Sequence, residues 1–312
     1  MSRIFDALQR SGAEQTGVEY PDMVSFASAV AEAPRVQEPT QESLPAAVAE
    51  MLAEIQPIAV EGATLKMTRQ EKAAAPPSLP FPELEVSVAP ESRLVFATQP
   101  ESLAAEKFRF LGVRLRQIRQ SRQLKKVLIT STIPEEGKSL VAVNLAGVLA
   151  RRKERVLLID GDLRRPVLSE NLGLGTLAGL AEWLQSGAQT PTNIYRLAGL
   201  EFWIMPAGHP PANVLELMQS GRLSALIQQL KDSFDWIIVD SPPLLPLADT
   251  TVWARLTDGT LLVTRQGTTQ KGPLQRGLEM IKKSDLLGVV LNGCADTDHK
   301  DYYRRYSPPG SK

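Results

Sequence analysis

The chain has 312 residues, of which 43% are hydrophobic, enough to build the core of one large or two ordinary domains. Its formal net charge is zero, so no overall excess of basic side chains indicates a nucleic-acid partner. The single cysteine, Cys294, excludes an internal disulfide and a cysteine-cluster metal site, and no run of about 18 apolar residues indicates a membrane span.

The first hundred residues differ in composition from the rest of the chain. Residues 1–10 are expected to form a short amphipathic helix, which is too short to be stable alone and either docks on a partner or membrane or frays. Residues 11–100 are rich in Pro, Ala and Glu without a sustained hydrophobic period, and are expected to be a disordered linker. The N-terminus lacks the apolar core of a secretory signal.

A helix rich in Arg and Leu is expected at 101–119, where the folded domain would begin. Residues at intervals of three on this helix include Glu106, Arg109 and Gly112. One interpretation is a solvated basic helix that packs on the domain through Leu103, Phe110 and Leu115. The other is a subunit contact.

The next stretch, 127–139, reads VLITSTIPEEGKS and predicts a phosphate-binding loop. A short apolar strand leads into a loop that ends in Gly137, Lys138 and Ser139, and apolar residues at helical spacing follow. Glycine lets backbone amides close on phosphate oxygens, and the helix N-terminus adds partial positive charge. Lys138 would reach the terminal phosphates and Ser139 would hold Mg²⁺. The usual first glycine of this motif is Thr132 here.

Strands and helices alternate through the rest of the chain. Strands are expected at 156–159, 202–205, 236–239, 260–264 and 287–291, and helices near 180–185, 214–231 and 274–282. Because the strands are apolar on both faces, this alternation predicts a mostly parallel sheet covered by helices on both faces. We therefore expect an α/β, P-loop NTPase-like fold preceded by a long disordered N-terminal region.

Three acidic residues follow two of these strands. Asp160 and Asp162 come directly after one strand, and Asp240 ends another. Ligands of such sheets bind at the carboxyl ends of the strands, where the loop of Lys138 also lies. One lysine, one serine hydroxyl and several carboxylates are the parts that phosphoryl transfer needs for metal binding and charge neutralisation. An isolated Asp after a strand is as easily a turn former or helix cap.

Three motifs resemble the bacterial tyrosine kinases (BY-kinases) of capsule and exopolysaccharide synthesis. They are TSTIPEEGKS, VLLIDGDLRRP and IIVDSPP, and the resemblance covers roughly 102–306, including LLGVVLN near the end. It implies an ATP- and Mg²⁺-dependent enzyme that transfers phosphate to tyrosine, with a kinase domain at 101–298.

The resemblance also implies roles for individual residues. The nucleotide-binding set comprises Thr132, Pro134, Glu136, Gly137, Lys138, Ser139 and Leu140. The Mg²⁺ site would comprise Ser139, Asp162 and Asp240, with Asp240 either a direct ligand or one contact removed from the ion. Asp160 would be the base that accepts the tyrosine proton. The loop departs from the family at Glu135, where glycine is frequent. A carboxylate near phosphate either points outward or lowers the affinity for nucleotide by repulsion.

The family's C-terminal tyrosine cluster is matched by Tyr302, Tyr303 and Tyr306 in a flexible tail at 299–312. By resemblance these are the phosphoacceptors, and a neighbouring subunit's site is the expected target because a tail must bend back sharply to reach its own.

The resemblance further implies a homo-oligomer. The family's Glu-x-x-Arg-x-x-Arg helix is matched by Glu106 and Arg109, and its third position is Gly112. The expected partner is the cytoplasmic end of a membrane-anchored polysaccharide co-polymerase, which would hold a cytoplasmic protein peripherally at the inner membrane, without nucleic acid.

Two alternatives share the fold. A partition or septum-positioning ATPase carries a lysine early in its loop, where this chain has Ile133. A catalytically weak ATP-binding scaffold of polysaccharide export would keep the loop without transferring phosphate to tyrosine. A GTPase is disfavoured, because no NKxD-type motif follows the later strands.

Overall fold

The computed structural model describes residues 81–86, 88, 92–245, 248–283 and 285–294. Every described residue belongs to one compact unit. The expected helix at 1–10, most of the expected linker and the tyrosine tail lie outside the described residues.

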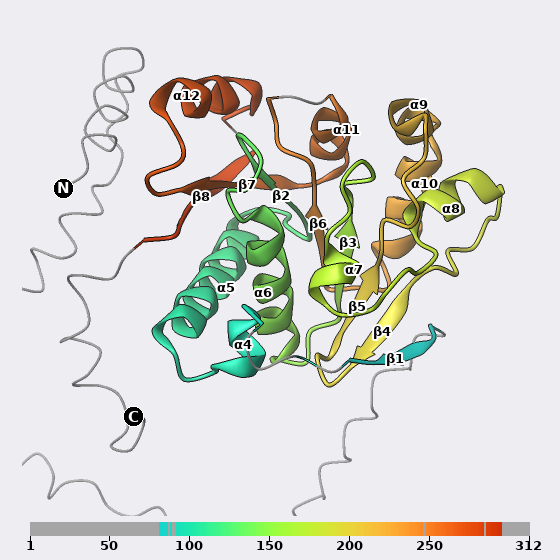
Figure 1. Ribbon diagram of the computed structural model, residues 1–312, viewed down its shortest axis with the longest axis horizontal. Coiled ribbons are helices and arrows are strands. Elements are labelled where there is room, and N and C mark those ends of the chain that lie inside the picture. Colours follow the sequence, from blue (N-terminus) through green and yellow to red (C-terminus); the bar gives the residue numbers. More distant parts are fainter. Residues whose placement is uncertain (1–80, 87, 89–91, 246–247, 284, 295–312) are drawn as a thin grey trace, which may run out of the picture. The chain divides into compact units, whose positions relative to one another are not determined.

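An eight-stranded sheet, in the order β1-β4-β5-β3-β6-β2-β7-β8, forms the centre of this unit (Figure 1). Every neighbouring pair is parallel except β4 and β5. The strands are β1 (Glu83–Glu85), β2 (Lys126–Ser131), β3 (Val156–Asp160), β4 (Tyr195–Ala198), β5 (Phe202–Met205), β6 (Trp236–Asp240), β7 (Gly259–Arg265) and β8 (Leu286–Asn292). The expected fold class is therefore confirmed.

Helices cover both faces of the sheet (Figure 1). They are α4 (Val95–Thr98), α5 (Leu103–Ser121), α6 (Lys138–Ala150), α7 (Leu168–Asn171), α8 (Leu180–Ser186), α9 (Val214–Gln219), α10 (Arg222–Leu230), α11 (Asp249–Leu256) and α12 (Lys271–Met280). One core cluster joins the sheet to α4, α5, α6 and α7, and a second joins its other face to α8, α9, α10 and α11. A small third cluster lies under α12. None of these helices combines the length and apolarity needed to cross a bilayer.

Helix α6, which follows the phosphate loop, is buried on nearly all sides. It lies between the sheet and the α4–α5 layer, which explains why its sequence is apolar around its whole circumference rather than along one stripe. The phosphate loop is therefore attached to the most deeply enclosed helix of the domain.

The folded domain begins earlier than residue 101, so the expected linker boundary at residue 100 is wrong. Strand β1 pairs with β4, and Phe96 on α4 is only 3% exposed and packs among core residues of α6 and β5. The Asn144 side chain of α6 also binds this segment, since its Nδ2 donates to the Arg93 carbonyl at 3.0 Å. Sequence periodicity misses the segment because each piece is only three or four residues long.

Two expectations about helices also need correction. Leu115 of α5 is buried, but Phe110 is 65% exposed, so Phe110 does not pack on the domain as one interpretation required. The expected helix at 214–231 is two helices, because Gly221 adopts a left-handed φ of 77° and ends the first of them.

Candidate active site

The topology brings the acidic motifs and the phosphate loop to one edge of the sheet. Strands β3, β6 and β2 are neighbours, and Asp160 lies directly opposite Asp240 in the parallel register. The loop that follows β2 leads into α6 at the same carboxyl edge. The sequence prediction that these motifs meet at one edge agrees with this arrangement.

The phosphate loop closes on the N-terminus of α6 through Gly137. This glycine is the N-cap residue, with φ 93° in the left-handed region, and no side chain caps the helix. The first amides of α6 therefore remain available to an anion at the positive end of the helix dipole. A second constraint also holds here, since a Cβ at Gly137 would lie 2.1 Å from the Asn292 side-chain nitrogen.

Lys138 lies at the centre of the site. Its Nζ is 3.3 Å from Asp162 Oδ2 and 3.9 Å from Asp240 Oδ1, and 3.4 Å from the Ser139 hydroxyl. Burial disfavours the charged ammonium, but the charges of Asp240 and Asp162 outweigh burial and raise the pKa of Lys138. The lysine is therefore charged and held against the carboxylates of both acidic motifs.

Asp240 is the residue whose surroundings best test whether the site fits a divalent cation. It is fully buried, and neither carboxylate oxygen has a hydrogen-bond partner among the described residues. Burial raises its pKa to about 6, and the charge of Lys138 and the nearby Ser139 hydroxyl act in the opposite direction. A buried carboxylate without donors is costly unless a charge satisfies it, so the residues fit a bound divalent cation.

The side chains around Asp240 could supply only part of the coordination sphere of a metal ion, which is typical of Mg²⁺ bound together with a nucleotide. No group of three or more His, Cys, Asp or Glu side chains gathers tightly enough to hold a metal in the part of the chain that the structure describes. Mg²⁺ is commonly held by one or two carboxylates together with phosphate oxygens and waters. Asp162, Asp240 and the Ser139 hydroxyl would supply the protein share of such a site.

Asp160 lies beneath this arrangement and is fully buried. Its two oxygens accept backbone hydrogen bonds from Asp162 and Leu168, both at 3.2 Å, so it holds the loop after β3 in place. Burial and the neighbouring charge of Asp240 raise the pKa of Asp160 to about 8. With this raised pKa the carboxyl holds a proton near neutral pH, so it can serve as a proton acceptor only when its pKa is lowered and it is ionised.

The two adjacent glutamates of the loop behave differently from each other. Glu135 is exposed, as the sequence required, and has a φ of 66°. Glu136 is fully buried, and its carboxylate accepts hydrogen bonds from Thr132 N at 2.7 Å and Ile133 N at 3.0 Å. It also accepts from the hydroxyls of Thr132 and Thr269. Glu136 therefore braces the loop from within, although its backbone remains beside the phosphate site.

The ends of two neighbouring strands hold the loop from outside. Asn292 Nδ2, at the end of β8, donates to the Glu136 carbonyl at 2.9 Å, and Arg265 Nη1, at the end of β7, donates to the Glu135 carbonyl at 3.1 Å. Sequence reasoning missed Arg265, Thr269 and Asn292 as loop contacts. The only signal for Arg265 and Asn292 was their position directly after the expected strands 260–264 and 287–291, where side chains converge on the ligand edge of a parallel sheet. Thr269 lies farther along the loop after β7 and had no such signal.

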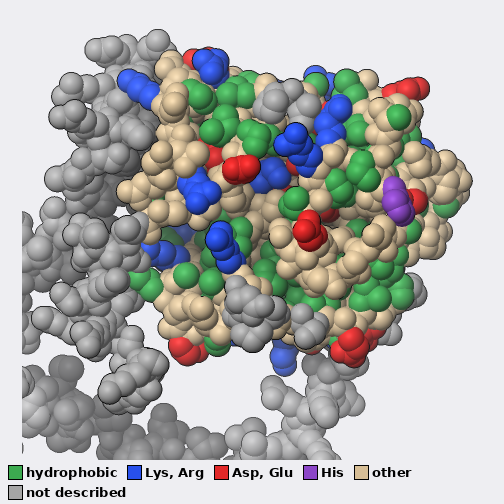
Figure 2. Space-filling model, viewed as in Figure 1, with side chains coloured by type: hydrophobic (Ala, Val, Ile, Leu, Met, Phe, Trp, Pro, Cys, Tyr) green, Lys and Arg blue, Asp and Glu red, His purple; other side chains and the backbone are tan. Residues whose placement is uncertain are grey.

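The other predicted loop residues are divided between the interior and the surface. Thr132 is buried through its bonds to Glu136, Leu140 is half-buried in the first turn of α6, and Pro134 is exposed. Several Lys and Arg side chains lie across the middle of the face in Figure 2, with isolated acidic side chains among them.

The predicted oligomer contacts lie on α5, away from the loop. Arg109 Nη1 contacts Glu106 Oε2 at 2.5 Å, and the two side chains are 39% and 51% exposed. Gly112 is buried against α6, where an added Cβ would meet Val148 at 3.5 Å. Position 112 therefore faces the domain's own interior. The predicted phosphoacceptor tyrosines lie outside the described residues.

A protein-family model covers most of the folded unit. Residues 123–302 match the ParA model, described as a NUBPL iron-transfer P-loop NTPase. The part of that description that agrees with the motifs of this chain is the P-loop NTPase scaffold. Membership of P-loop NTPases implies nucleotide binding.

Curated relatives show which family of P-loop NTPases the chain resembles. The chain is 32% identical to Tyrosine-protein kinase YwqD of Bacillus subtilis over 214 residues, which cover 68% of this chain and 90% of that protein. The chain belongs to the bacterial tyrosine kinase family. A further family relative is the Succinoglycan biosynthesis transport protein ExoP of Rhizobium meliloti, 33% identical over 206 residues that cover 64% of this chain but 26% of ExoP.

Solved structures of the bacterial tyrosine kinase family agree with this assignment. The kinase domain of Escherichia coli tyrosine kinase ETK matches with a TM-score of 0.62 and 29% identity, over 65% of this chain and 81% of that one. The chimerical protein CapA2B2 matches with a TM-score of 0.61 and 27% identity, over 68% and 93%. The family therefore accounts for the fold and for the three motifs that meet at the sheet edge.

Proposed function

We propose that this chain is an ATP- and Mg²⁺-dependent protein-tyrosine kinase that phosphorylates tyrosines of its own C-terminal tail. The observation that carries the proposal is the buried Asp240 carboxylate without hydrogen-bond donors, 3.9 Å from the ammonium of Lys138 at the start of an uncapped helix. That arrangement suits a nucleotide's phosphates and their metal ion better than it suits a protein core.

Each side chain has a part in this reaction. The amides at the start of α6 and the ammonium of Lys138 bind and orient the phosphate chain. Ser139, Asp162 and Asp240 would hold Mg²⁺, which when bound neutralises developing phosphate charge. Ionised Asp160 would accept the proton of the tyrosine hydroxyl as the tyrosine oxygen bonds to the γ-phosphorus of ATP and the bond from that phosphorus to ADP breaks. Positive charge near Asp162 and Asp240 would lower the pKa of Asp160, which favours this role.

The biological setting follows from the relatives. ExoP is named as a succinoglycan biosynthesis transport protein, so we place this chain in capsule or exopolysaccharide production. Its partner would be the cytoplasmic end of a membrane-anchored co-polymerase, and it would lie in the cytoplasm, peripheral to the inner membrane. Self-association would use α5, where Glu106 and Arg109 are partly exposed and Phe110 is 65% exposed beside them.

Incubation of the purified protein with labelled ATP and Mg²⁺, followed by phosphosite mapping with mass spectrometry, tests the proposal. We expect phosphate on Tyr302, Tyr303 or Tyr306. Lys138→Ala should reduce labelling by at least ~10²-fold, as expected when a preorganised charge is removed from a transferring phosphate. The control Lys283→Ala, at an exposed lysine, should retain labelling.

Changing all three tail tyrosines to Phe should remove most self-labelling and preserve phosphorylation of an external tyrosine peptide. Unchanged labelling in a folded Lys138→Ala protein would contradict the loop assignment. ATP hydrolysis without any tyrosine labelling would favour the partition-type ATPase, which the ParA family match also accommodates. ATP binding with neither activity would favour a scaffold of the export machinery.

A further inference from the structure

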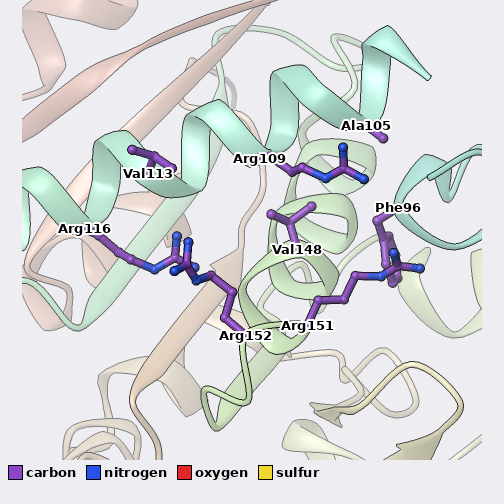
Figure 3. Close-up of a pocket in the computed structure, with 8 residues that line it drawn as sticks. All are labelled: Phe96, Ala105, Arg109, Val113, Arg116, Val148, Arg151 and Arg152. Carbon is purple, nitrogen blue, oxygen red and sulfur yellow. The ribbon is translucent and has the colours of Figure 1, made fainter. Parts of the chain in front are cut away.

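A second cationic feature lies at the opposite end of α6 from the phosphate loop. A cavity of about 210 Å³ opens between α4, α5 and the end of α6. Its apolar lining is formed by Phe96, Ala105, Val113 and Val148, and its polar lining by Arg109, Arg116, Arg151 and Arg152 (Figure 3). From Lys138 to Arg151 the helix rises about 20 Å, so the cavity is separate from the nucleotide site.

The four arginines differ in how their charges are satisfied. Arg109 is paired with Glu106, and Arg116 is paired with Glu154 at 2.9 Å. Among the described residues, no carboxylate lies within ion-pair distance of Arg151 or Arg152. The guanidinium of Arg151 lies 6.0 Å from the centre of the Phe96 ring. Two exposed positive charges therefore remain at the cavity without an acidic partner in the described part of the chain.

The cavity combines these charges with an apolar floor. Phe96, Ala105 and Val148 are 3%, 1% and 6% exposed, whereas Val113 at the rim is 38% exposed. The side chains of Arg116 and Arg152 point toward one another in Figure 3, and because Glu154 pairs with Arg116 only, a bound anion would offset the charge of Arg152. A complementary ligand has a flat apolar body for the floor and a dianionic group for the arginines.

We propose that this cavity binds a phosphotyrosine side chain of the C-terminal tail. The aromatic ring would lie on the apolar floor, and the phosphate, with about −1.5 to −2 charges, would match the two unpaired guanidinium groups. Phosphoserine lacks the apolar body that the floor requires. The proposal rests on the proposed function only for the source of the phosphate, since binding itself needs no kinase activity.

The tail has the length and the chemistry for this site. The described chain ends at Cys294, beside the loop contact Asn292, and from there to Tyr306 an extended chain spans about 40 Å. That reach exceeds the length of α6. Glu101 and Glu106, which contact Arg109 of the cavity lining, are 75% and 51% exposed and can also pair with basic residues that flank the tyrosines. A phosphorylated tail held there would be kept away from the nucleotide site.

Fluorescence anisotropy with synthetic peptides tests the site on the full chain without added ATP. The labelled peptide covers residues 298–310 and carries phosphotyrosine at one of the three tail positions. We expect the phosphotyrosine peptide to bind, and the unphosphorylated and phosphoserine versions to bind at least about tenfold more weakly. Equal affinity for the phosphoserine version would overturn the proposal.

Three variants locate the binding. Arg151→Ala with Arg152→Ala should weaken phosphopeptide binding at least about tenfold, because charge-assisted hydrogen bonds to phosphate are lost. Val113→Phe should weaken it similarly by filling the cavity mouth while leaving every charge in place. The control Arg114→Ala, an exposed arginine on the same helix outside the cavity, should retain the affinity. Wild-type affinity in either of the first two proteins would overturn the site.

Other anions are separate outcomes. If ADP or anionic lipid vesicles lose binding in the double arginine variant while the phosphopeptide does not, the cavity takes a different ligand and the proposal is wrong. If peptides bind as expected but ATP never labels tyrosine, the site stands and the proposed kinase activity fails. If ATP labels the tail tyrosines but the phosphotyrosine peptide does not bind, the proposed kinase activity stands and the cavity proposal is wrong.

Discussion

Replacing Glu136 by Ala should destabilise the protein strongly, whereas the same change at its neighbour Glu135 should not. The Glu136 carboxylate is fully buried and accepts the backbone N–H groups of Thr132 and Ile133. Alanine leaves these two donors without their acceptor, and a buried unsatisfied donor costs roughly 1–3 kcal/mol. The free energy of unfolding should therefore fall by about 3 kcal/mol or more, with the melting temperature lower by roughly 6–12 °C.

Glu135→Ala is the matched control, because it removes the same charge one position away. The Glu135 side chain is exposed, so its loss should change stability by no more than about 0.5 kcal/mol. Glu136→Gln should lie between the two, since its amide oxygen can still accept from the backbone. Urea denaturation followed by circular dichroism measures all three. Equal stability of the two alanine variants would refute the bracing role of Glu136.

Three further outcomes follow from the fold. Deleting residues 1–98 should destabilise the domain by about 3–5 kcal/mol in denaturant titration, because the deletion removes the buried Phe96. Deleting residues 1–80 is the control: it leaves every described residue in place and should change stability little. Gly147→Ala should lower the melting temperature although alanine favours helices, because its Cβ would lie 2.3 Å from the Phe96 ring; no loss would refute this packing. The ligand-free protein should lose stability as pH rises from about 4 to about 8, because the folded state keeps the Asp160 proton that the unfolded state releases near pH 3.8. Denaturation at several pH values measures this dependence, and Asp160→Asn should make it weaker.

The sequence predicted the central strands because burial on both faces leaves an unmistakable apolar run. Strand β3 and strand β6 are such runs, and each ends in the carboxylate that the site uses. Strand β1, with the sequence Glu-Leu-Glu, has no comparable signal, because an edge strand of three residues depends on its pairing with β4. The segment around Phe96 also lacks a recognisable sequence pattern, since one aromatic side chain has no periodicity.

The chemistry of the site was more predictable than its supports. The positions of Lys138, Asp162 and Asp240 follow from where parallel strands end. Which of two adjacent glutamates enters the interior does not follow from composition, because it depends on the left-handed φ of Glu135. The contacts from Thr269 and Asn292 cross more than 130 residues of chain, and no local pattern reports contacts of that separation.

The fit between Gly137 and Asn292 has a consequence for how tolerance to substitution at the loop is interpreted. A side chain at 137 would be disfavoured twice: by the left-handed backbone angle, and by the amide of Asn292, which lies 2.1 Å from the position of a Cβ and would have to move. The second exclusion involves no nucleotide at all. In a library of variants selected only for soluble folded protein, glycine at 137 would still be retained, and truncating Asn292 to alanine would remove one of its two causes. Depletion of substitutions at this position therefore measures the closure of the last strand over the loop as well as phosphate binding.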